Sequence, residues 1–201
     1  MDQRKKFSQL IFGTAGIPTS TEPRSTLEGI RKVKELGLGA MELEFVHSVN
    51  ISETLAVEVR QRAEQEEVVL SCHAPYYINL NAVEEAKREA SRKRLYDSAH
   101  ILGKCGGWSA AFHAGFNLGK PGEYVYQRIR ESVKDVRHQL ESEGNDVWLR
   151  PETMGKPVQF GTLDEVLRLS EEVEGVAPLL DWGHLQAMDN GKTNGKAAFS
   201  G

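Results

Sequence analysis

The sequence predicts an α/β fold of the TIM (β/α)8-barrel type, of which this chain supplies about six of the eight βα units. Short apolar runs alternate with helical stretches along the chain. Each unit takes about 30 residues, the usual length of a βαβ unit. Histidines and carboxylates follow several of the apolar runs, as expected where the carboxyl ends of parallel strands share one face of a barrel.

Six strands are expected, one at each short apolar run. Runs such as VVL and APLL are typical of strands that are buried on both faces. The expected strands are SQLIFGTAG (8–16), AMELEF (40–45), VVLSCH (68–73), SAAFHAG (109–115), VWLRPE (147–152) and APLLDW (177–182).

Five helices are expected between these strands, and none after the sixth. Ser25 is the N-cap expected for the first helix, with Glu28 three residues later completing a capping box. Ser52, together with Glu53, opens the second helix. The expected helices cover residues 26–37, 53–66, 83–102, 122–142 and 163–173.

Length and composition are those of one globular domain, so residues 1–201 are expected to form a single, incomplete barrel domain. The net charge of −4 argues against a generally basic nucleic-acid-binding surface but leaves room for a local basic groove. Cys72 and Cys105 form no CxxC pair, which favours an intracellular, cytoplasmic location. No apolar stretch is long enough to span a membrane, so no membrane partner is expected.

The candidate metal ligands stand where apolar runs stop, and they are His73, His113, Glu152, Asp181 and His184. A single histidine at a strand end is more often a hydrogen-bonded core residue. Several such residues at successive strand ends favour a shared site, because a buried carboxylate needs a partner or a metal. Histidine and carboxylate ligands around one barrel mouth suit zinc or a similar divalent ion.

For two pairs of residues the sequence allows more than one role. Asp181 and His184 could serve adjacent metals, or Asp181 could cap the next turn while His184 faces solvent. Glu42 and Glu44 share one face of their strand and could face the barrel mouth or pair with arginine or lysine.

Tyr76 and Tyr77 follow the third strand closely. They could fill the core, or they could stack on a nucleobase or sugar beside the mouth. His47, His100 and His138 carry little functional signal, and the last two fall within expected helices.

The motifs SCHAPYYINL, FHAG, PET-x-G and DWGH, taken in order, resemble those of the endonuclease IV family of apurinic/apyrimidinic endonucleases. That family lies within the xylose isomerase-like TIM-barrel superfamily. The resemblance implies a TIM barrel with a trinuclear zinc site that cleaves the phosphodiester 5′ to an abasic site in damaged double-stranded DNA. His73 and His113 would bind one zinc. Glu152, the candidate catalytic residue, would bridge it to a second zinc, which Asp181 also binds, and His184 would bind the third.

The resemblance extends to the substrate-binding residues, for Tyr76 matches a DNA-inserting aromatic and Tyr77 adjoins it. Several family features have no counterpart. These are a histidine after strand six, an Asp-x-His after strand seven and a glutamate after strand eight. The chain also has His-Ala-Gly in place of His-Pro-Gly and Arg-Pro-Glu-Thr-Met in place of Glu-Asn-Thr, and the loop FVHSVN is short.

Three functions are compatible with these residues. The first is an endonuclease IV-like phosphodiesterase with two or three zinc ions, although other divalent metals could bind. The second is a sugar isomerase or epimerase of the same superfamily, acting with one divalent ion on a small sugar substrate. The third is an inactive, truncated relative. Six strands cannot close an eight-stranded barrel. The segment is therefore expected to be part of a longer chain, to self-associate through its open edges or to be poorly stable alone, and at most weak abasic-site cleavage is expected from it.

Overall fold

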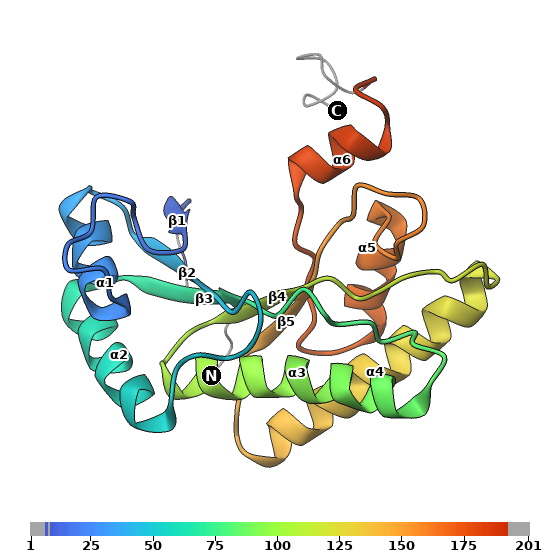
Figure 1. Cartoon of the computed structure of the whole chain (residues 1–201), viewed down its shortest axis with the longest axis horizontal. Helices are drawn as coiled ribbons and strands as arrows, with labels where there is room; N and C mark the ends of the chain where they lie inside the picture. Colours follow the sequence, from blue (N-terminus) through green and yellow to red (C-terminus); the bar gives the residue numbers. More distant parts are fainter. Residues whose placement is uncertain (1–6, 8, 193–201) are drawn as a thin grey trace.

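The structure, a computed structural model, describes residue 7 and residues 9–192, and in them a parallel sheet is covered by helices (Figure 1). The strands pair in the order β1-β2-β3-β4-β5, and every pairing is parallel. The expected α/β barrel order is therefore confirmed. The strands are β1 (Gly13–Ala15), β2 (Ala40–Glu44), β3 (Val69–His73), β4 (Ser109–Phe112) and β5 (Trp148–Pro151).

A helix follows each strand and packs on the outer side of the sheet (Figure 1). The bounds of the first five agree closely with those expected from the sequence. The helices are α1 (Thr26–Glu35), α2 (Glu53–Glu66), α3 (Glu85–Lys104), α4 (Gly122–Ser142), α5 (Leu163–Glu172) and the short α6 (Trp182–Met188).

Side-chain caps start most of these helices. The Ser25 hydroxyl accepts a hydrogen bond from the backbone N–H of Glu28 at 3.2 Å, as expected. The Glu28 carboxylate accepts from Arg31 at 2.8 Å, so only half of the expected capping box forms there. A complete capping box starts α5, where Thr162 and Glu165 bind each other's backbone N–H groups.

The two faces of β2 and β3 differ in burial, whereas all four residues of β4 are buried. In β2, Met41 and Leu43 are buried against the helices, whereas the intervening glutamates are half-buried on the lumen side. β3 shows the same alternation, with Val69 and Ser71 half-buried. The expected burial of the runs VVL and APLL on both faces is therefore wrong, because Val69 and residues 177–179 are only half-buried and Leu180 is exposed. The packed core lies between the sheet and the helices.

The sheet stays open between β1 and the last segment of the chain (Figure 1). The first strand was expected over residues 8–16 but covers only Gly13–Ala15. Leu10 and Phe12, just before it, expose 79% and 68% of their surface. An edge strand has a hydrogen-bonding partner on one side only, which explains why the regular ladder is short.

The sixth expected strand is present only as isolated bridges. Val176 pairs with Leu149, and Leu179 pairs with Glu152, both in parallel. The chain then enters α6, a helix that the sequence was not expected to form. Asp181 is its N-cap and accepts a hydrogen bond from the backbone N–H of His184 at 2.7 Å. The cap starts a helix where the expected strand APLLDW would have continued.

No helix in the described part of the chain combines the length and the apolar character needed to cross a bilayer. The expected cytoplasmic location stays a prediction.

Candidate metal centre

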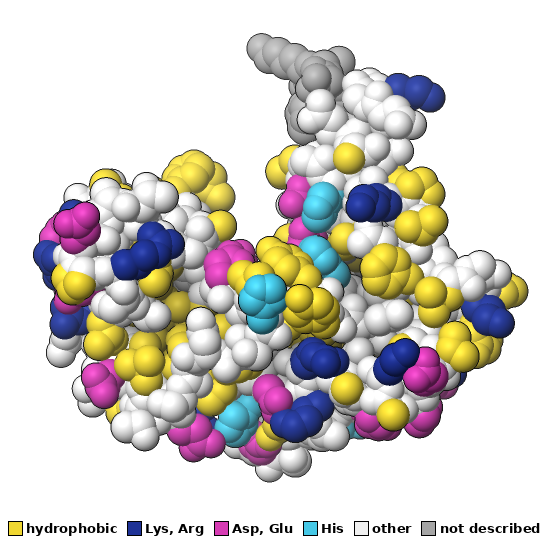
Figure 2. Space-filling view, viewed as in Figure 1, with side chains coloured by type: hydrophobic (Ala, Val, Ile, Leu, Met, Phe, Trp, Pro, Cys, Tyr) yellow, Lys and Arg dark blue, Asp and Glu magenta, His cyan; other side chains and the backbone are white. Residues whose placement is uncertain are grey.

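Three of the predicted ligands meet where neighbouring strands end. His73 is the last residue of β3, and His113 and Glu152 directly follow β4 and β5. Nε2 of His73 lies 2.9 Å from Oε2 of Glu152, and Nε2 of His113 lies 3.2 Å from the same oxygen. Figure 2 shows histidine side chains gathered beside hydrophobic ones near the centre of this face. The expected convergence of these three side chains is present.

A backbone contact orients the His73 ring. Its Nδ1–H donates to the carbonyl of Ala74 at 2.8 Å, which turns Nε2 towards Glu152. The His73 and His113 rings stand edge to face, with centroids 5.0 Å apart. A histidine whose second ring nitrogen is held by a carbonyl is the usual arrangement for a metal ligand.

A second group of possible ligands shares Glu152. It consists of Glu152, Asp181 and His184, which each offer one ligand atom within 4.8 Å of the others. Nδ1 of His184 lies 3.1 Å from Oε1 of Glu152, whereas the two strand-end histidines face Oε2. The two carboxylate oxygens of Glu152 therefore face different groups.

Asp181 is placed for both roles that the sequence left open, that of a helix cap and that of a possible metal ligand. One of its oxygens caps α6, and its side chain also belongs to the second ligand group. The side chains of Asp181 and His184 are 38% and 34% exposed, so solvent reaches this side of the site.

The site holds a carboxylate that is almost completely buried. Glu152 is only 5% exposed. Burial alone would raise its pKa, but hydrogen bonds from His113 and His73 lower the pKa well below the usual range. For His73, burial lowers the pKa, and the hydrogen bonds to Glu152 and Ala74 outweigh it and raise the pKa. The histidines thus stabilise a buried negative charge, as a cation would.

These donors fit a divalent cation. Each group offers three protein ligands of the nitrogen and carboxylate type that zinc and related ions bind. Three ligands leave coordination positions for water or substrate, which is typical of catalytic sites. That the five residues act as metal ligands, and Glu152 in catalysis, stays a prediction.

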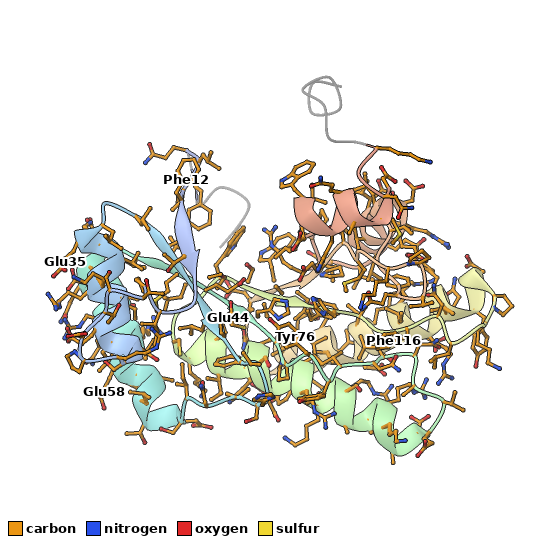
Figure 3. The ribbon with its side chains drawn as sticks, turned by 45° about the horizontal axis from the view of Figure 1, so that its top comes forward. Phe12, Glu35, Glu44, Glu58, Tyr76 and Phe116 are labelled. Atoms are coloured by element: carbon orange, nitrogen blue, oxygen red, sulfur yellow. The ribbon has the colours of Figure 1, made fainter. Side chains whose placement is uncertain are left out.

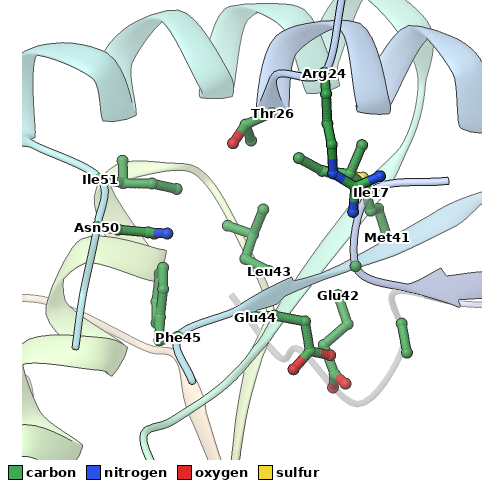
Figure 4. A pocket seen from close by; sticks show the side chains of 12 residues that line it. Ile17, Arg24, Thr26, Met41, Glu42, Leu43, Glu44, Phe45, Asn50 and Ile51 are labelled. Carbon is green, nitrogen blue, oxygen red and sulfur yellow. The ribbon is translucent and has the colours of Figure 1, made fainter. Parts of the chain in front are cut away.

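Glu42 and Glu44 lie next to each other on the lumen side of β2, opposite Met41 and Leu43 (Figure 4). They border a cavity of about 310 Å³. Burial, and then the charge of Glu44, raise the pKa of Glu42 to about 7. Neither carboxylate forms a salt bridge with a described arginine or lysine, so the pairing that the sequence left open is absent.

The tyrosines lie on the surface of the mouth instead of filling the core. Tyr76 is 49% exposed, and its ring centroid lies 5.2 Å from that of His73 and 5.4 Å from that of His113. Tyr77 is 60% exposed and stacks on His47. Figure 3 shows Tyr76 and Glu44 near the middle of the molecule, between its two ends.

Thr153, for which the motif PET-x-G predicted no role of its own, is fully buried beside the site. Its hydroxyl accepts from the backbone N–H of Asp181 at 2.9 Å, and its carbonyl accepts from Nδ1 of His184 at 2.9 Å. The available signal was a hydroxyl residue directly after a strand-end carboxylate. His100 and His138 lie on α3 and α4, as expected.

Comparisons with known proteins agree with this fold. A family model described as a xylose isomerase-like TIM barrel matches residues 30–199. An uncharacterized protein of Methanocaldococcus jannaschii is 40% identical over 190 residues, which cover 94% of this chain and 67% of that protein.

Two solved structures are similar in fold. Endonuclease IV from Thermus thermophilus matches with a TM-score of 0.72 and 19% identity, over 95% of this chain and 70% of that one. A D-psicose 3-epimerase matches with a TM-score of 0.71 and 18% identity, over 88% of this chain and 65% of that one. The chain thus spans about two thirds of the length of these proteins. The expected superfamily is confirmed, whereas endonuclease IV and the sugar epimerases match equally well. The chain belongs to the xylose isomerase-like TIM barrel family.

Proposed function

We propose that this protein is a zinc-dependent phosphodiesterase that incises damaged double-stranded DNA 5′ to abasic sites. The main support for this proposal is the carboxylate of Glu152, which two groups of possible metal ligands share. Its two oxygens face two ligand groups, one with His73 and His113 and one with Asp181 and His184. A carboxylate in this position can bridge two cations, and paired cations are a common device of phosphodiester-cleaving enzymes.

When bound, the cations would supply Lewis-acid charge that stabilises the attacking and leaving oxygens of the phosphodiester. The protein's own residues would fix the geometry. Ala74 holds the ring of His73 in one orientation, and the sheet places Glu152 beside it. The Tyr76 ring covers the two strand-end histidines and limits the access of water on that side.

The loops around the mouth favour a polyanionic substrate. Residues 45–52, 74–84, 113–121 and 153–162, which connect β2 to β5 with the helices that follow them, contain one acidic residue, Glu84. Two of these loops present the exposed residues Lys120 and Lys156. A nucleic-acid backbone that approaches along these loops, past Lys120 and Lys156, therefore meets few loop carboxylates.

The exposed tyrosines favour contacts with a base or a sugar. Tyr76 adjoins the ligand group, and Tyr77 is stacked on His47 from the neighbouring loop. Aromatic rings in such positions stack on nucleobases that are displaced from a duplex.

A sugar epimerase or isomerase is the second candidate, and Glu42 favours it. The two carboxylates on β2 lie on the lumen side, close enough to the site for Glu152 to affect the Glu42 side chain electrostatically. A carboxyl group with a pKa of about 7 is suited to proton transfer at neutral pH. The D-psicose 3-epimerase whose structure is similar to this fold acts, as its name says, on D-psicose.

One pair of assays distinguishes the two functions. The purified chain, loaded with zinc, is given a duplex with one abasic-site analogue and, separately, a ketose. We expect weak, zinc-dependent incision 5′ to the lesion and no epimerisation. The variant His113→Ala should reduce incision tenfold or more, roughly the effect of losing a metal ligand's support. His138→Ala, on the exposed side of α4, is the matched control and should retain the wild-type rate. Ketose epimerisation that is lost in Glu42→Gln, without incision, would overturn the proposal in favour of the epimerase.

A further inference from the structure

We propose that the cavity bordered by Trp108 and Arg150 binds a small organic carboxylate with an apolar body. Arg150 and the indole N–H of Trp108 would hold the carboxylate group. The cavity measures about 310 Å³, which falls within the range of about 300–1,000 Å³ that is usual for small-molecule sites. This inference goes beyond the proposed function and does not depend on any bound cation.

The Arg150 cavity lies where the strands begin, whereas the candidate metal ligands lie where they end. Ala40, Val69 and Ser109, which line the cavity, are the first residues of β2, β3 and β4. His73 is the last residue of β3, so roughly 13 Å of strand separates it from Val69. A ligand in this cavity is therefore distinct from a substrate at the metal centre.

Two hydrogen-bond donors in the wall of the cavity lack an acceptor. Nε of Arg150 and Nε1 of Trp108 are buried, and neither has a hydrogen-bond partner among the described residues. Nη1 of Arg150 does have one, since it donates to the carbonyl of Pro178 at 3.1 Å. Buried donors are nearly always satisfied in folded proteins, so two orphaned donors in one wall indicate a place for an acceptor.

The charge of Arg150 favours an anionic acceptor. Its guanidinium carbon lies 4.3 Å from the centroid of the Trp108 ring, which fixes the cation against the wall. Among the described residues, no aspartate or glutamate lines the cavity. Burial lowers the pKa of Arg150, because no neighbouring negative charge offsets it. The buried Arg137, by contrast, has a carboxylate partner, Glu141, at 3.1 Å.

The other walls are largely apolar and favour a ligand with an apolar body. Val69 and Leu179 face the cavity from the sheet and the segment after α5, and Ile11 faces it from the segment before β1. An inorganic anion would lose hydration against these side chains without compensation. An aryl carboxylate can bury its ring there and keep its charge at Arg150.

The first test titrates the metal-free wild type with benzoate in the presence of a chelator. The readout is the indole N–H signal of each tryptophan in nitrogen–proton NMR. We expect a saturable shift of the Trp108 signal and no shift for Trp182, which lies on α6 away from the cavity. Benzyl alcohol keeps the apolar ring without the charge, and inorganic phosphate keeps the charge without the ring. Each should bind at least roughly tenfold more weakly than benzoate.

Three outcomes of this titration would overturn the inference. The first is a Trp108 signal that does not respond to benzoate. The second is a response to phosphate or benzyl alcohol as strong as that to benzoate, because the ligand would then need only one of the two features. The third is a Trp108 signal that changes with protein concentration and not with benzoate, because a second copy of the chain would then fill the cavity.

The second test removes the charge. Arg150→Met keeps an apolar stem and should weaken benzoate binding by roughly tenfold or more while leaving benzyl alcohol binding unchanged. Arg168→Met is the matched control, because Arg168 also lies over a ring, that of Tyr126 at 3.8 Å, but outside the cavity. Benzoate should raise the unfolding midpoint of the wild type and Arg168→Met, and not that of Arg150→Met.

Equal benzoate affinity in the wild type and Arg150→Met would overturn the inference. If Arg150→Met does not fold, the wild-type titrations with benzoate, benzyl alcohol and phosphate decide alone. None of these measurements contains zinc or DNA, so their outcome is independent of the incision assay that tests the proposed function.

Discussion

Nε2 of His73 lies 2.9 Å from Oε2 of Glu152, although the two residues are 79 positions apart in the chain. Their strands, β3 and β5, are both hydrogen-bonded to β4 and end at the same edge of the sheet. This part of the site is therefore built by the sheet itself and needs no loop to close. Its geometry should persist without a bound cation.

The first prediction concerns Glu152. Glu152→Gln keeps the size of the side chain but removes the charge that both ligand groups share, so we expect it to abolish the binding of both cations. His73→Ala should remove one cation only. Metal content measured after dialysis against limiting zinc checks this. Two ions retained by Glu152→Gln would contradict the shared-carboxylate arrangement.

The second prediction concerns Gly161, whose φ is +136°. A Cβ there would lie 2.7 Å from the Glu152 carbonyl oxygen and 2.6 Å from the Met154 side chain. Gly161→Ala should therefore lower the free energy of unfolding by roughly 1–3 kcal/mol and displace Glu152. Gly119 also has a positive φ, of +66°, but no atom within 4 Å of the added Cβ. Gly119→Ala should thus cost only the roughly 1–2 kcal/mol of the left-handed backbone, and zinc affinity should be unchanged.

Urea unfolding and zinc titration of both glycine variants check this prediction. Equal effects of the two substitutions on zinc affinity would show that contact with the Glu152 carbonyl has no influence on the site.

The third prediction concerns the pH dependence of stability. Hydrogen bonds from Arg168 and Gln127 lower the pKa of Glu123 to about 2, from an ordinary value of 4.5. Because the folded-state pKa is the lower one, this carboxylate stabilises the fold fully above about pH 4.5. The contribution is lost as the pH falls through about 2.

Glu123→Gln should therefore destabilise the protein at pH 6, and the difference from the wild type should shrink steadily below pH 4.5. The pair is exposed, so the effect should be small and should decrease in high salt. Urea unfolding between pH 6 and pH 2 measures it, with Glu171→Gln on α5 as the control. A difference that stays constant over this range would contradict the prediction.

The sequence could predict the ligand positions because they depend on local patterns. An apolar run followed by histidine or glutamate places His73, His113 and Glu152 at strand ends, and parallel order then brings them together. Strand length at the edges was not predictable in this way. β1 and the segment around Leu179 each have a partner on one side, so their apolar residues do not form a full ladder.

The roles of two other residues depend on their neighbours in space. Thr153 acts through a hydrogen bond that departs from the regular ladder, and no sequence pattern records that departure. The pKa of Glu42 depends on burial and on the charge of Glu44, so the strand periodicity shows which face they share but not what they meet there.

The fourth prediction concerns the open edge of the sheet, where Phe12 projects from the chain just before β1 (Figure 3). Unpaired edge groups and exposed apolar side chains promote association between chains. We expect the purified protein to self-associate as its concentration rises. Phe12→Ser should reduce this association, whereas Val57→Ser, at an exposed position on α2, should not. Sedimentation velocity checks both, and a wild-type chain that stays monomeric throughout would contradict the prediction.

Helix α6 has no side chain in the core, yet it carries His184 and is capped by Asp181. Such a segment opens more readily than the sheet, because little apolar area holds it closed. A cation bound there would therefore contribute its binding free energy directly to the local folding of α6. Metal binding would therefore hold residues 182–188 in their folded position. The sensitivity of this segment to protease should fall as zinc is added.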